Sequence, residues 1–352
     1  MYADRHYPQQ PIPPARLDEY LADGWFRMGQ TIFTTRFLFF NNELYTAIWT
    51  RLLLDEHRFT KRQRKIMRRI RTRFRIEYGP LELDAERELL FRRYRQYRRR
   101  YGNFTLRQSL FDHKAVSVYD TWEVRIYDGD RLICYSHFDL GNTSVQSISG
   151  VFDPEYAGFS LGYASMLFEM EWCLLNGYTH YYPGYIVPGY PAFDYKRRIG
   201  NLEYLLLPEE RWEPLHDLSE ERIGSLVMET RLRELRNRLE PGTEIMFNPS
   251  FEMRLQDRQG QLMDTLSYPV FLLLFPMTVM FGLAYVVVYD DIRHVYQLAS
   301  YNVVGSVGIR NEAQKFPANV FEKVLTIDSI VLETDDLNAM AEEVRSWGAA
   351  NL

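Results

Sequence analysis

The chain has 352 residues, with 42 Lys and Arg against 47 Asp and Glu for a formal net charge of −5, and 46% of its residues are hydrophobic. This is a globular composition, which excludes a disordered, collagen-like or disulfide-stapled chain, and the length predicts about two domains. Cys134 and Cys173 lie far apart in apolar runs, so neither a disulfide framework nor a cysteine-rich metal site is expected. Together with a polar, proline-rich N-terminus, this cysteine usage predicts a cytoplasmic protein.

The first predicted elements are short strands in an N-terminal region, residues 1–57. Residues 24–45, GWFRMGQTIFTTRFLFFNNELY, are rich in β-branched and aromatic side chains and are interrupted by Gly29 and by Asn41-Asn42. Such a pattern is typical of strands separated by turns.

Residues 58–107 hold a concentrated positive charge. They contain 18 Lys and Arg against five acids, a net charge of +13, so the remainder of the chain carries −18. Because so many uncompensated cations repel one another, we favour a polyphosphate partner over the alternative of a merely solvated helical face. Charge alone leaves RNA, DNA and anionic lipid open, since phosphate contacts carry little sequence information.

Two basic amphipathic helices are predicted in residues 58–107, on either side of Gly79-Pro80. In the first helix, Ile66, Ile70 and Phe74 form an apolar stripe at helical spacing. Its other faces are cationic, and the predicted phosphate-binding side chains are Lys61, Arg62, Arg64, Lys65, Arg68 and Arg69. The second helix has apolar or aromatic residues at helical spacing and a stop at Gly102, the spaced residues being Leu90, Phe91, Tyr94, Tyr97 and Tyr101.

Residues 108–207 are predicted to hold a strand-helix-strand unit. Short strands fill residues 115–153, with a hairpin turn at Asp128-Gly129. Ser160 is the expected N-cap of a helix that ends at Gly177, and a strand resumes at residues 178–182. One side of this helix is traced by Leu161, Ala164, Leu167, Phe168, Glu171 and Leu175. The helix start, residues 160–162, is a possible anion site because helix N-termini attract negative charge.

Residues 208–352 are predicted to be a charged helical linker followed by a β-rich region. Residues 265–289 contain no charged side chain and are long enough to cross a bilayer. However, Pro269, Pro276 and Gly282 divide them into two strand-length pieces, and the second piece continues into residues 292–301 as a hairpin would. We therefore favour two strands over a membrane span and expect no stable membrane association. The coarse organisation is α+β or α/β.

Five short motifs then suggest a family. In chain order they are Gly24-Trp25-Phe26-Arg27-Met28-Gly29, the basic segment FTKRQRKIMRR at 59–69, FDPEY at 152–156, Ser160-Leu161-Gly162, and Tyr181-Tyr182-Pro183-Gly184-Tyr185-Ile186 followed by Tyr195-Lys196. Over residues 18–207 the chain resembles aminoacyl-tRNA protein transferases, the arginyl or leucyl transferases of the N-degron system. The resemblance implies an α+β, acetyltransferase-like (GNAT-type) mixed sheet with flanking helices.

Two features depart from the family pattern. Many members have a cysteine cluster implicated in metal or iron-sulfur binding, whereas residues 34–57 contain no cysteine. Of the family's Lys-Met-x-Tyr-Lys, residues 192–196 keep the terminal Tyr195-Lys196. No metal and no cofactor are therefore expected, and charged tRNA is the expected co-substrate.

The resemblance implies a reaction in which a protein N-terminal amine attacks the ester between an amino acid and tRNA. The product is a protein with an added Arg or Leu on an acidic N-terminus, marked for degradation. Because this ester is already activated, the protein has to position its substrates, take a proton from the amine and stabilise an oxyanion.

Residue roles follow from the same resemblance. The candidate catalytic residues are Asp139, Ser160 and Tyr182, with His180 as another candidate proton acceptor. The candidate substrate-binding residues are Gly162, Tyr163, Tyr181, Tyr185, Tyr195 and Lys196. Lys196 would pair with the acidic acceptor side chain, and an aromatic would stack on the terminal adenine. A purely structural role stays open for these residues. Strand tyrosines usually pack in the core, Ser160 would serve as an N-cap alone, and Asp153-Pro154 would form a turn.

Two other functions stay open. One is a non-catalytic tRNA- or RNA-binding protein on the same scaffold, suggested by the missing cysteines. The other is an acyl-CoA-dependent N-acetyltransferase, which the absence of a Gly-rich loop before the helix disfavours. The sequence leaves the oligomeric state undetermined.

Overall fold

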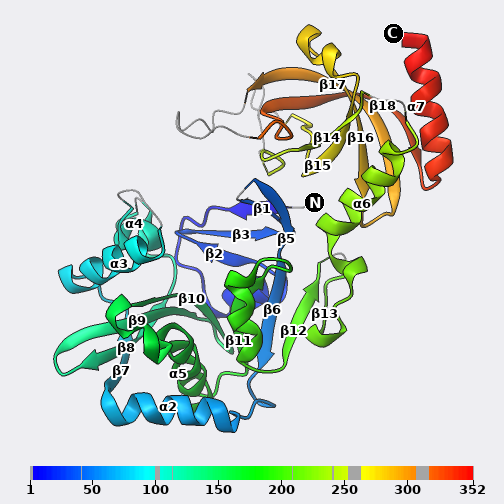
Figure 1. Ribbon diagram of the computed structural model, residues 1–352. Coiled ribbons are helices and arrows are strands. Elements are labelled where there is room, and N and C mark those ends of the chain that lie inside the picture. The colour runs from blue at the N-terminus through cyan, green and yellow to red at the C-terminus, as the bar shows by residue number, and fades with distance from the viewer. Residues whose placement is uncertain are drawn as a thin grey trace. The chain divides into compact units, whose positions relative to one another are not determined.

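The computed structural model describes residues 3–40, 42–99, 104–112, 114–207, 209–239, 242–252, 263–306 and 317–351 (Figure 1). The chain divides into two compact units. The larger unit comprises residues 5–34 and 48–218, and the smaller unit takes the described parts of 3–4, 35–47 and 219–351. The sequence placed a domain boundary at 207/208, whereas the chain leaves the larger unit after Leu218.

An eight-stranded mixed sheet forms the centre of the larger unit, in the order β13-β12-β6-β11-β10-β9-β8-β7. The strands are β6 (Ile48–Leu53), β7 (Arg75–Pro80), β8 (Thr121–Asp128), β9 (Arg131–Leu140), β10 (Ser144–Phe152), β11 (His180–Ile186), β12 (Leu202–Leu206) and β13 (Arg211–Pro214). Strands β10 and β11 are parallel and their neighbours pair antiparallel. The predicted α+β class, the hairpin at Asp128-Gly129 and the strand-helix-strand unit are confirmed.

Helices cover both faces of this sheet. The helices are α1 (Pro14–Ala22), α2 (Lys61–Arg73), α3 (Ala85–Tyr97), α4 (Leu106–Phe111) and α5 (Leu161–Leu175). Helix α5 packs on β9 and β10 and against α2, while α3 packs on the same strands and against α4. Figure 1 shows α3 and α4 on one side of strands β8 to β10 and α2 on the other. The antiparallel strands leading through α5 into parallel β11 give the acetyltransferase-like arrangement.

The N-terminal strands agree with prediction. They are β1 (Ala3–His6), β2 (Phe26–Met28), β3 (Thr31–Thr35), β4 (Phe37–Phe40) and β5 (Glu43–Thr46), of which β1, β3 and β2 form one small sheet and β4 and β5 another. Gly29 has a φ of 59°, a left-handed conformation that glycine adopts without strain, and it makes the turn between β2 and β3.

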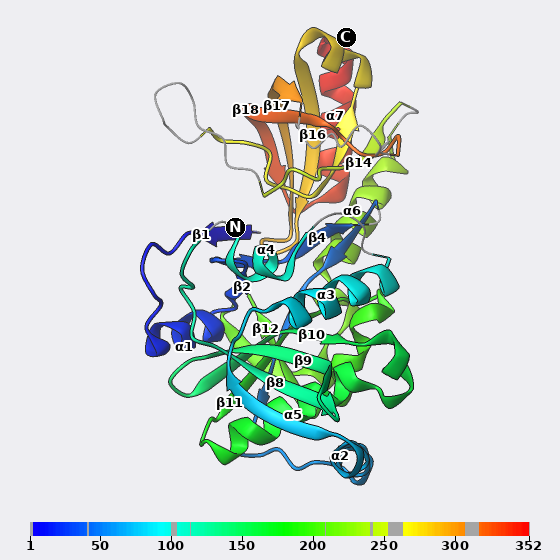
Figure 2. The same cartoon turned by 90° about the vertical axis from the view of Figure 1, so that its left-hand side faces the viewer.

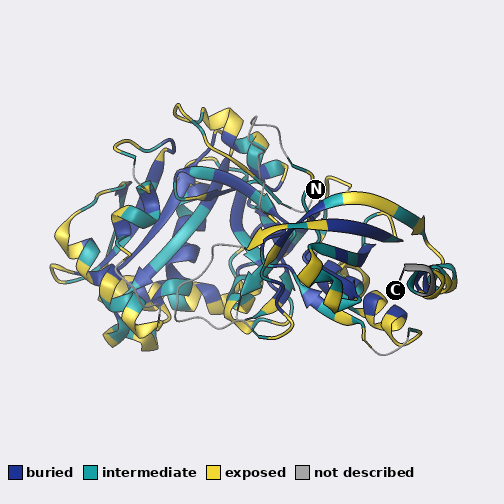
Figure 3. Cartoon of the chain, turned by 90° about the horizontal axis from the view of Figure 1, so that it is seen from above, coloured by how far each residue is buried: buried dark blue, intermediate teal, exposed yellow. Residues whose placement is uncertain are grey.

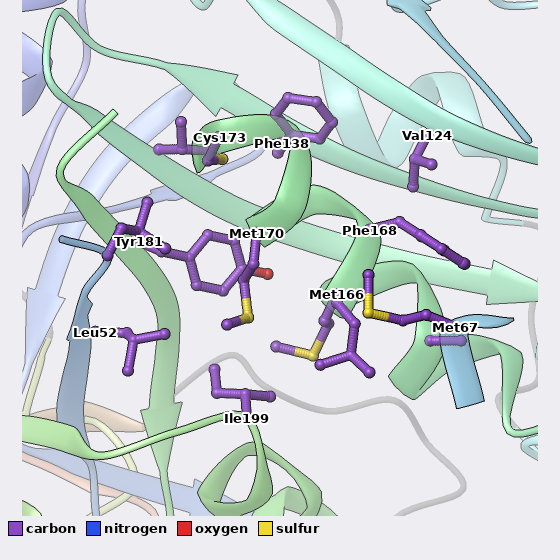
Figure 4. Close-up of a cluster of buried hydrophobic side chains, with 14 of the residues drawn as sticks. Leu52, Met67, Val124, Phe138, Met166, Phe168, Met170, Cys173, Tyr181 and Ile199 are labelled. Atoms are coloured by element: carbon purple, nitrogen blue, oxygen red, sulfur yellow. The ribbon is translucent and has the colours of Figure 1, made fainter. Parts of the chain in front are cut away.

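The core below the sheet is built around α5. Helix α5 is buried at Leu161, from Ala164 to Met170, and at Cys173. Figure 4 shows Met166 and Met170 of this helix near Tyr181, Leu52 and Ile199, and Phe138 near Cys173. The predicted apolar side is correct for Leu161 to Phe168, but Leu175 is 81% exposed because burial ends at Cys173. The helix ends at Leu175, two residues before the predicted Gly177.

The two basic helices form close to where they were predicted. In α2 the buried positions are Gln63, Met67 and Ile70, followed by Phe74, so Ile66 lies at the edge of the predicted stripe and is only partly buried. In α3, Leu90 and Phe91 are buried, whereas Tyr97 is 51% exposed because the helix ends there. The predictions for Tyr101 and Gly102 lie outside the described residues.

The smaller unit has its own sheet and core. Its elements are α6 (Gly224–Arg236), β14 (Glu244–Phe247), β15 (Val270–Leu274), β16 (Leu283–Asp290), β17 (Val295–Ser306), β18 (Lys323–Thr334) and α7 (Leu337–Asn351), and the strands pair in that order. Figure 2 shows α7 lying along this sheet, in contact with β17 and β18. Figure 3 colours the residues by burial, and central strands of both sheets are buried along most of their length, as β9 and β15 are.

The uncharged residues 265–289 belong to this sheet. They contain β15, a short helical turn at Pro276–Phe281, and most of β16, which forms the predicted hairpin with β17. The preferred two-strand interpretation is confirmed. Among the described residues, every helix is too short or too polar to cross a membrane.

Candidate functional site

A cavity opens where β10 and β11 separate. The two strands pair from Ser144–Gln146 to His180–Tyr182 and then diverge. A cavity of about 780 Å³ is lined by the following residues of both strands, 147–152 on one side and 183–185 on the other. Because the paired register ends at Gln146 and Tyr182, the main-chain groups beyond these residues do not pair across the gap.

Several other elements also line this cavity. The start of α5 contributes Ser160, Gly162, Tyr163 and Met166, and helix α3 contributes Phe91, Tyr94, Arg95 and Arg98. The segment before and within the short helical turn η2 (Pro191–Arg198) contributes Tyr190, Ala192, Phe193, Tyr195 and Lys196. Strand β2 contributes Phe26, Arg27 and Met28. Aromatic rings and cations therefore surround one opening, a combination that suits a nucleotide and its phosphate.

Six of the nine predicted catalytic and substrate-binding residues meet in this cavity. They are Ser160, Gly162, Tyr163, Tyr185, Tyr195 and Lys196. They come from three separate segments of the chain, so the strand separation brings together residues up to 36 positions apart. Their functional roles stay predictions, but their proximity is now a property of the fold.

Ser160 has an unusual backbone conformation at the cavity. Its φ of 58° and ψ of 42° are left-handed, which costs a non-glycine residue energy and concentrates at functional sites. Its carbonyl accepts hydrogen bonds from Tyr163 N and Ala164 N at 3.1 and 3.0 Å. The expected N-cap position is confirmed, but the side chain makes no capping hydrogen bond because the left-handed backbone turns it away from the first turn. Its hydroxyl is exposed at the cavity instead.

Lys196 is a partly buried cation at the cavity wall. Its Nζ donates to the carbonyl oxygen of Tyr185 at 2.9 Å and lies 5.5 and 5.3 Å from the ring centres of Tyr185 and Phe193. Within the described ranges no carboxylate pairs with it, and burial lowers the pKa of Lys196 to about 7. Gly184, with a φ of 82°, permits this approach, because a Cβ there would stand 3.3 Å from Nζ.

Asp139 lies away from the cavity, in a buried ion pair. Its Oδ1 accepts hydrogen bonds from Arg27 at 2.8 Å and from Thr121 at 2.6 Å, and both charged side chains are at most 1% exposed. Burial raises the pKa of Asp139, and Arg27 opposes this shift. Its partner Arg27 does line the cavity. The geometry favours a positioning role for Asp139 over direct contact with substrate.

Tyr181 and Tyr182 also lie in the packed interior. Tyr181 donates to Glu169 at 2.6 Å within the core around α5. Tyr182 packs edge-on against Phe26 and Trp212 on the other face of the sheet. Tyr181 and Tyr182 are therefore both core residues, which is the alternative that the sequence left open. An irregularity of β11 between Tyr181 and Gly184 breaks the strict alternation and turns Tyr185 toward the cavity.

His180 is the remaining candidate proton acceptor. It contacts the Thr179 hydroxyl at 2.8 Å, and burial lowers its pKa. It is absent from the residues that line the cavity.

A second groove runs along the basic helix α2. This groove, of about 630 Å³, is lined by Lys61, Arg64, Lys65, Arg68 and Arg71 together with Phe59, Met67, Thr72 and Glu171. The two other predicted cations, Arg62 and Arg69, are exposed on the same helix. Arg71 pairs with Glu171, whereas the six predicted cations make no ion pair with any acid in the described parts of the chain. These six are thus accessible to phosphate.

The second basic helix differs from the first. Arg87 is buried and paired with Glu123, and it also contacts Asp84 and Glu82. Arg93 pairs with Asp153 and Glu155. Asp153 itself is buried and starts the short helical turn at Pro154, so the turn interpretation of Asp153-Pro154 is confirmed. The positive charge of residues 58–107 is therefore partly neutralised on α3 and concentrated on α2.

Three further candidate functional residues were not predicted from the sequence: Gln63, Ser147 and Glu169. Gln63 joins α2 to the cavity segment: its amide donates to the carbonyl oxygens of Ile199 and Arg198 at 2.9 and 3.0 Å. A signal existed, because Thr60 and Gln63 form a capping box of the Ser/Thr-x-x-Gln type. Ser147 and Glu169 had no such signal, since one is a strand serine and the other a lone acid in an apolar helix.

The larger unit thus combines an acetyltransferase-like mixed sheet with a cavity at the β10–β11 separation. Residues 86–206 match the family model described as arginine-tRNA-protein transferase, C terminus. This part of the chain is therefore similar to the aminoacyl-tRNA-protein transferases.

Curated relatives are named aspartate/glutamate leucyltransferase. The protein of Leptospira interrogans is 28% identical over 158 residues, which cover 42% of this chain and 59% of the relative. That of Vibrio vulnificus is 24% identical over 196 residues, covering 55% of this chain and 80% of the relative. The chain thus spans 59% of the length of the first of these relatives.

Solved structures give a limited likeness. L-PGS from Bacillus licheniformis aligns with a TM-score of 0.31 and 12% identity over 48% of this chain and 49% of that one. A GCN5-related glucosamine N-acetyltransferase region of a fungal multi-domain protein aligns with a TM-score of 0.29 and 13% identity over 45% of this chain and 19% of that one.

Proposed function

We propose that this protein transfers an amino acid, Leu or Arg, from charged tRNA to the N-terminal amine of a protein that begins with an acidic residue. The observation that carries the proposal is the cavity at the β10–β11 separation, which brings together six predicted catalytic and substrate-binding residues in the unit that also presents α2. The added residue would mark the acceptor for degradation. The match of residues 86–206 to the family model and the names of the relatives support the same reaction class.

The tRNA backbone is assigned to α2. Lys61, Arg64, Lys65 and Arg68 line one groove without acidic partners, which suits a series of phosphates. The buried amide of Gln63 fixes this helix to residues 198–199, directly after the segment that carries Tyr195 and Lys196. Binding of tRNA at α2 is thereby connected to the position of the cavity wall.

The charged 3′ end is assigned to the cavity. Its rings, among them Tyr163, Tyr185 and Phe193, offer surfaces for the terminal adenine, since aromatic stacking accepts any base. The first amides of α5, at Leu161 and Gly162, lie at a helix N-terminus and are suited to a phosphate or to the developing oxyanion.

The acceptor's acidic side chain is assigned to Lys196. This ammonium reaches the cavity and has no carboxylate partner within the described residues. A substrate carboxylate would supply the missing counter-charge and restore the normal protonation of the lysine. The hydroxyl of Ser160 lies on the same cavity and would contact the reacting groups.

A transfer assay tests the proposal. Purified full-length protein is incubated with tRNAs charged with radiolabelled Leu, Arg and other amino acids, and with peptides that begin with Asp, Glu, Gly or Lys. The proposal expects label on the Asp and Glu peptides from at least one charged tRNA. Salt-sensitive tRNA binding without any transfer would instead identify the non-catalytic RNA-binding alternative.

A further inference from the structure

Glu169 is a carboxylic acid buried in the middle of an otherwise apolar helix. Every residue of α5 from Ala164 to Met170 is buried, and Glu169 is 0% exposed. Its carboxylate accepts hydrogen bonds from Tyr181 Oη at 2.6 Å and from Ser136 Oγ, and the Ser147 side chain also lowers its pKa. Burying a carboxylate is costly, so its retention at the centre of a core needs an explanation.

No cation compensates this acid in the described parts of the chain. The ionisable groups that face it are Tyr181 from β11, Cys134 from β9 and Cys173 from its own helix, all neutral since burial raises their pKa values. Helix α2 packs on α5, but its Arg71 pairs with Glu171 instead. Burial accordingly raises the pKa of Glu169 to about 7, with the three hydroxyls opposing the shift.

Ser147 connects Glu169 to the cavity. It is the first residue of β10 after the pairing with β11 ends, and the β9–β10 register is irregular between Ser147 and Ser149. Its side chain is half-buried and lines the 780 Å³ cavity, and it is one of the three hydroxyls that lower the pKa of Glu169. Ser136 and Tyr181 bind the same carboxylate but do not line the cavity. The Ser147 hydroxyl therefore lies between the buried carboxylate of Glu169 and the cavity.

We propose that Glu169 and Ser147 form a proton relay for the attacking amine; this inference rests on the proposed transfer function. The acceptor's α-ammonium gives one proton to Ser147 Oγ, whose own proton passes to the Glu169 carboxylate. The neutral amine then forms the N–C bond to the ester carbon, and the bond from that carbon to the ribose oxygen breaks. The amine's second proton goes to this ribose oxygen, and Glu169 returns its proton to solvent through Ser147.

The relay assigns Ser147 as the group that touches the reactants and Glu169 as a residue that acts through it. Asp139 suits this task less well because it is held in a buried ion pair with Arg27 and does not line the cavity. Lys196 is occupied by the acceptor carboxylate in the proposed complex. Glu169 remains as the acid with access to the cavity through a single side chain.

The test compares Glu169→Gln, Ser147→Ala and Ser147→Thr with Ser136→Ala, the matched control that loses a hydroxyl on the same carboxylate away from the cavity. Single-turnover transfer rates are measured from pH 5.5 to 9, beside tRNA and peptide affinities. We expect Glu169→Gln and Ser147→Ala to bind both substrates normally. Their transfer rate should fall about 100-fold, and its inflection near pH 7 should disappear. Ser147→Thr should restore the rate, and Ser136→Ala should retain it within about threefold.

A second readout does not need activity. In ¹³C NMR of Glu-labelled protein, a carboxyl signal absent from Glu169→Gln should titrate near pH 7, and its midpoint should rise in Ser147→Ala because a stabilising donor is lost. Equal rate losses in Ser136→Ala and Ser147→Ala, or a midpoint below about 5, would overturn the relay. An inactive wild type with the expected titration would contradict the transfer function and leave the buried pair as observed.

Discussion

Lys196 Nζ lies 2.9 Å from the carbonyl oxygen of Tyr185, and this hydrogen bond holds a cation at the wall of the cavity without a carboxylate beside it in the described residues. The pKa of Lys196 is lowered to about 7, so the ammonium loses its charge as pH rises through neutrality. We predict that KM for an Asp-starting peptide increases between pH 7 and 9. Lys196→Arg should abolish this increase, since arginine stays charged. A KM that is independent of both pH and Lys196 would contradict the assignment.

Desolvation of Lys196 should also cost stability. Its pKa in the folded protein is below the ordinary lysine pKa of 10.5, so the unfolded chain binds the proton more tightly between about pH 7 and 10. The cost is therefore full below pH 7 and decreases as pH rises toward 10. Lys196→Met should raise the free energy of unfolding at pH 7 and raise it less at pH 10, as measured by urea denaturation. A destabilised Met variant at pH 7 would show that the Tyr185 contact outweighs desolvation.

The buried Arg27–Asp139 pair should be mainly structural. Removing one partner of such a pair leaves an uncompensated charge, so Arg27→Ala or Asp139→Asn should lower the free energy of unfolding by about 3–5 kcal/mol. Arg51→Ala, which breaks the more exposed pair with Glu203 at 2.7 Å, is the control and should cost about 1 kcal/mol or less. If Asp139→Asn keeps its stability but loses transfer at saturating substrate, Asp139 acts in the chemistry.

Helix α2 should dominate the salt dependence of tRNA binding. Lys61→Glu with Arg64→Glu should weaken binding at low salt and reduce the slope of log affinity against log salt by about 1.4–1.8, the value for two lost phosphate contacts. The matched control is Arg236→Glu with Lys323→Glu, an equal charge change on exposed residues of the smaller unit. Equal effects of the two double variants would mean that overall charge, and not α2, controls binding.

Replacing Ser160 by glycine should raise the stability of the fold and lower the transfer rate. Because its φ of 58° suits glycine, Ser160→Gly should stabilise the fold by up to about 1 kcal/mol. If the hydroxyl contacts the reacting groups, the same variant should transfer more slowly at saturating substrates. Thermal unfolding and single-turnover rates measure both effects. An unchanged rate in the stabilised variant would reduce Ser160 to its backbone role.

The sequence predicted those parts of the site that local patterns determine. The Ser160 helix start and the cationic stripe of α2 follow from short-range patterns and lie where expected, whereas the strand predicted at residues 178–182 spans His180–Ile186. Which strand tyrosine faces the cavity could not be predicted, because the irregularity of β11 between Tyr181 and Gly184 shifts the alternation.

Tertiary contacts account for the remaining differences. From the sequence, Arg87 resembles a further phosphate ligand. In the structure its guanidinium is paired with the carboxylate of Glu123, 36 residues later. Glu169 looks like a surface position of an amphipathic helix, yet α5 is buried on nearly all sides. Both outcomes depend on the pairing of distant strands, which periodicity within one segment does not reveal.

The most direct test of the account is the transfer assay with the Lys196→Met variant beside the wild type. The wild-type protein should move radiolabelled Leu or Arg from its charged tRNA to Asp- and Glu-starting peptides in preference to Gly-starting ones, and Lys196→Met should lose most of that preference while still binding tRNA. A folded wild-type protein that binds charged tRNA and transfers nothing to any acceptor would contradict the central claim.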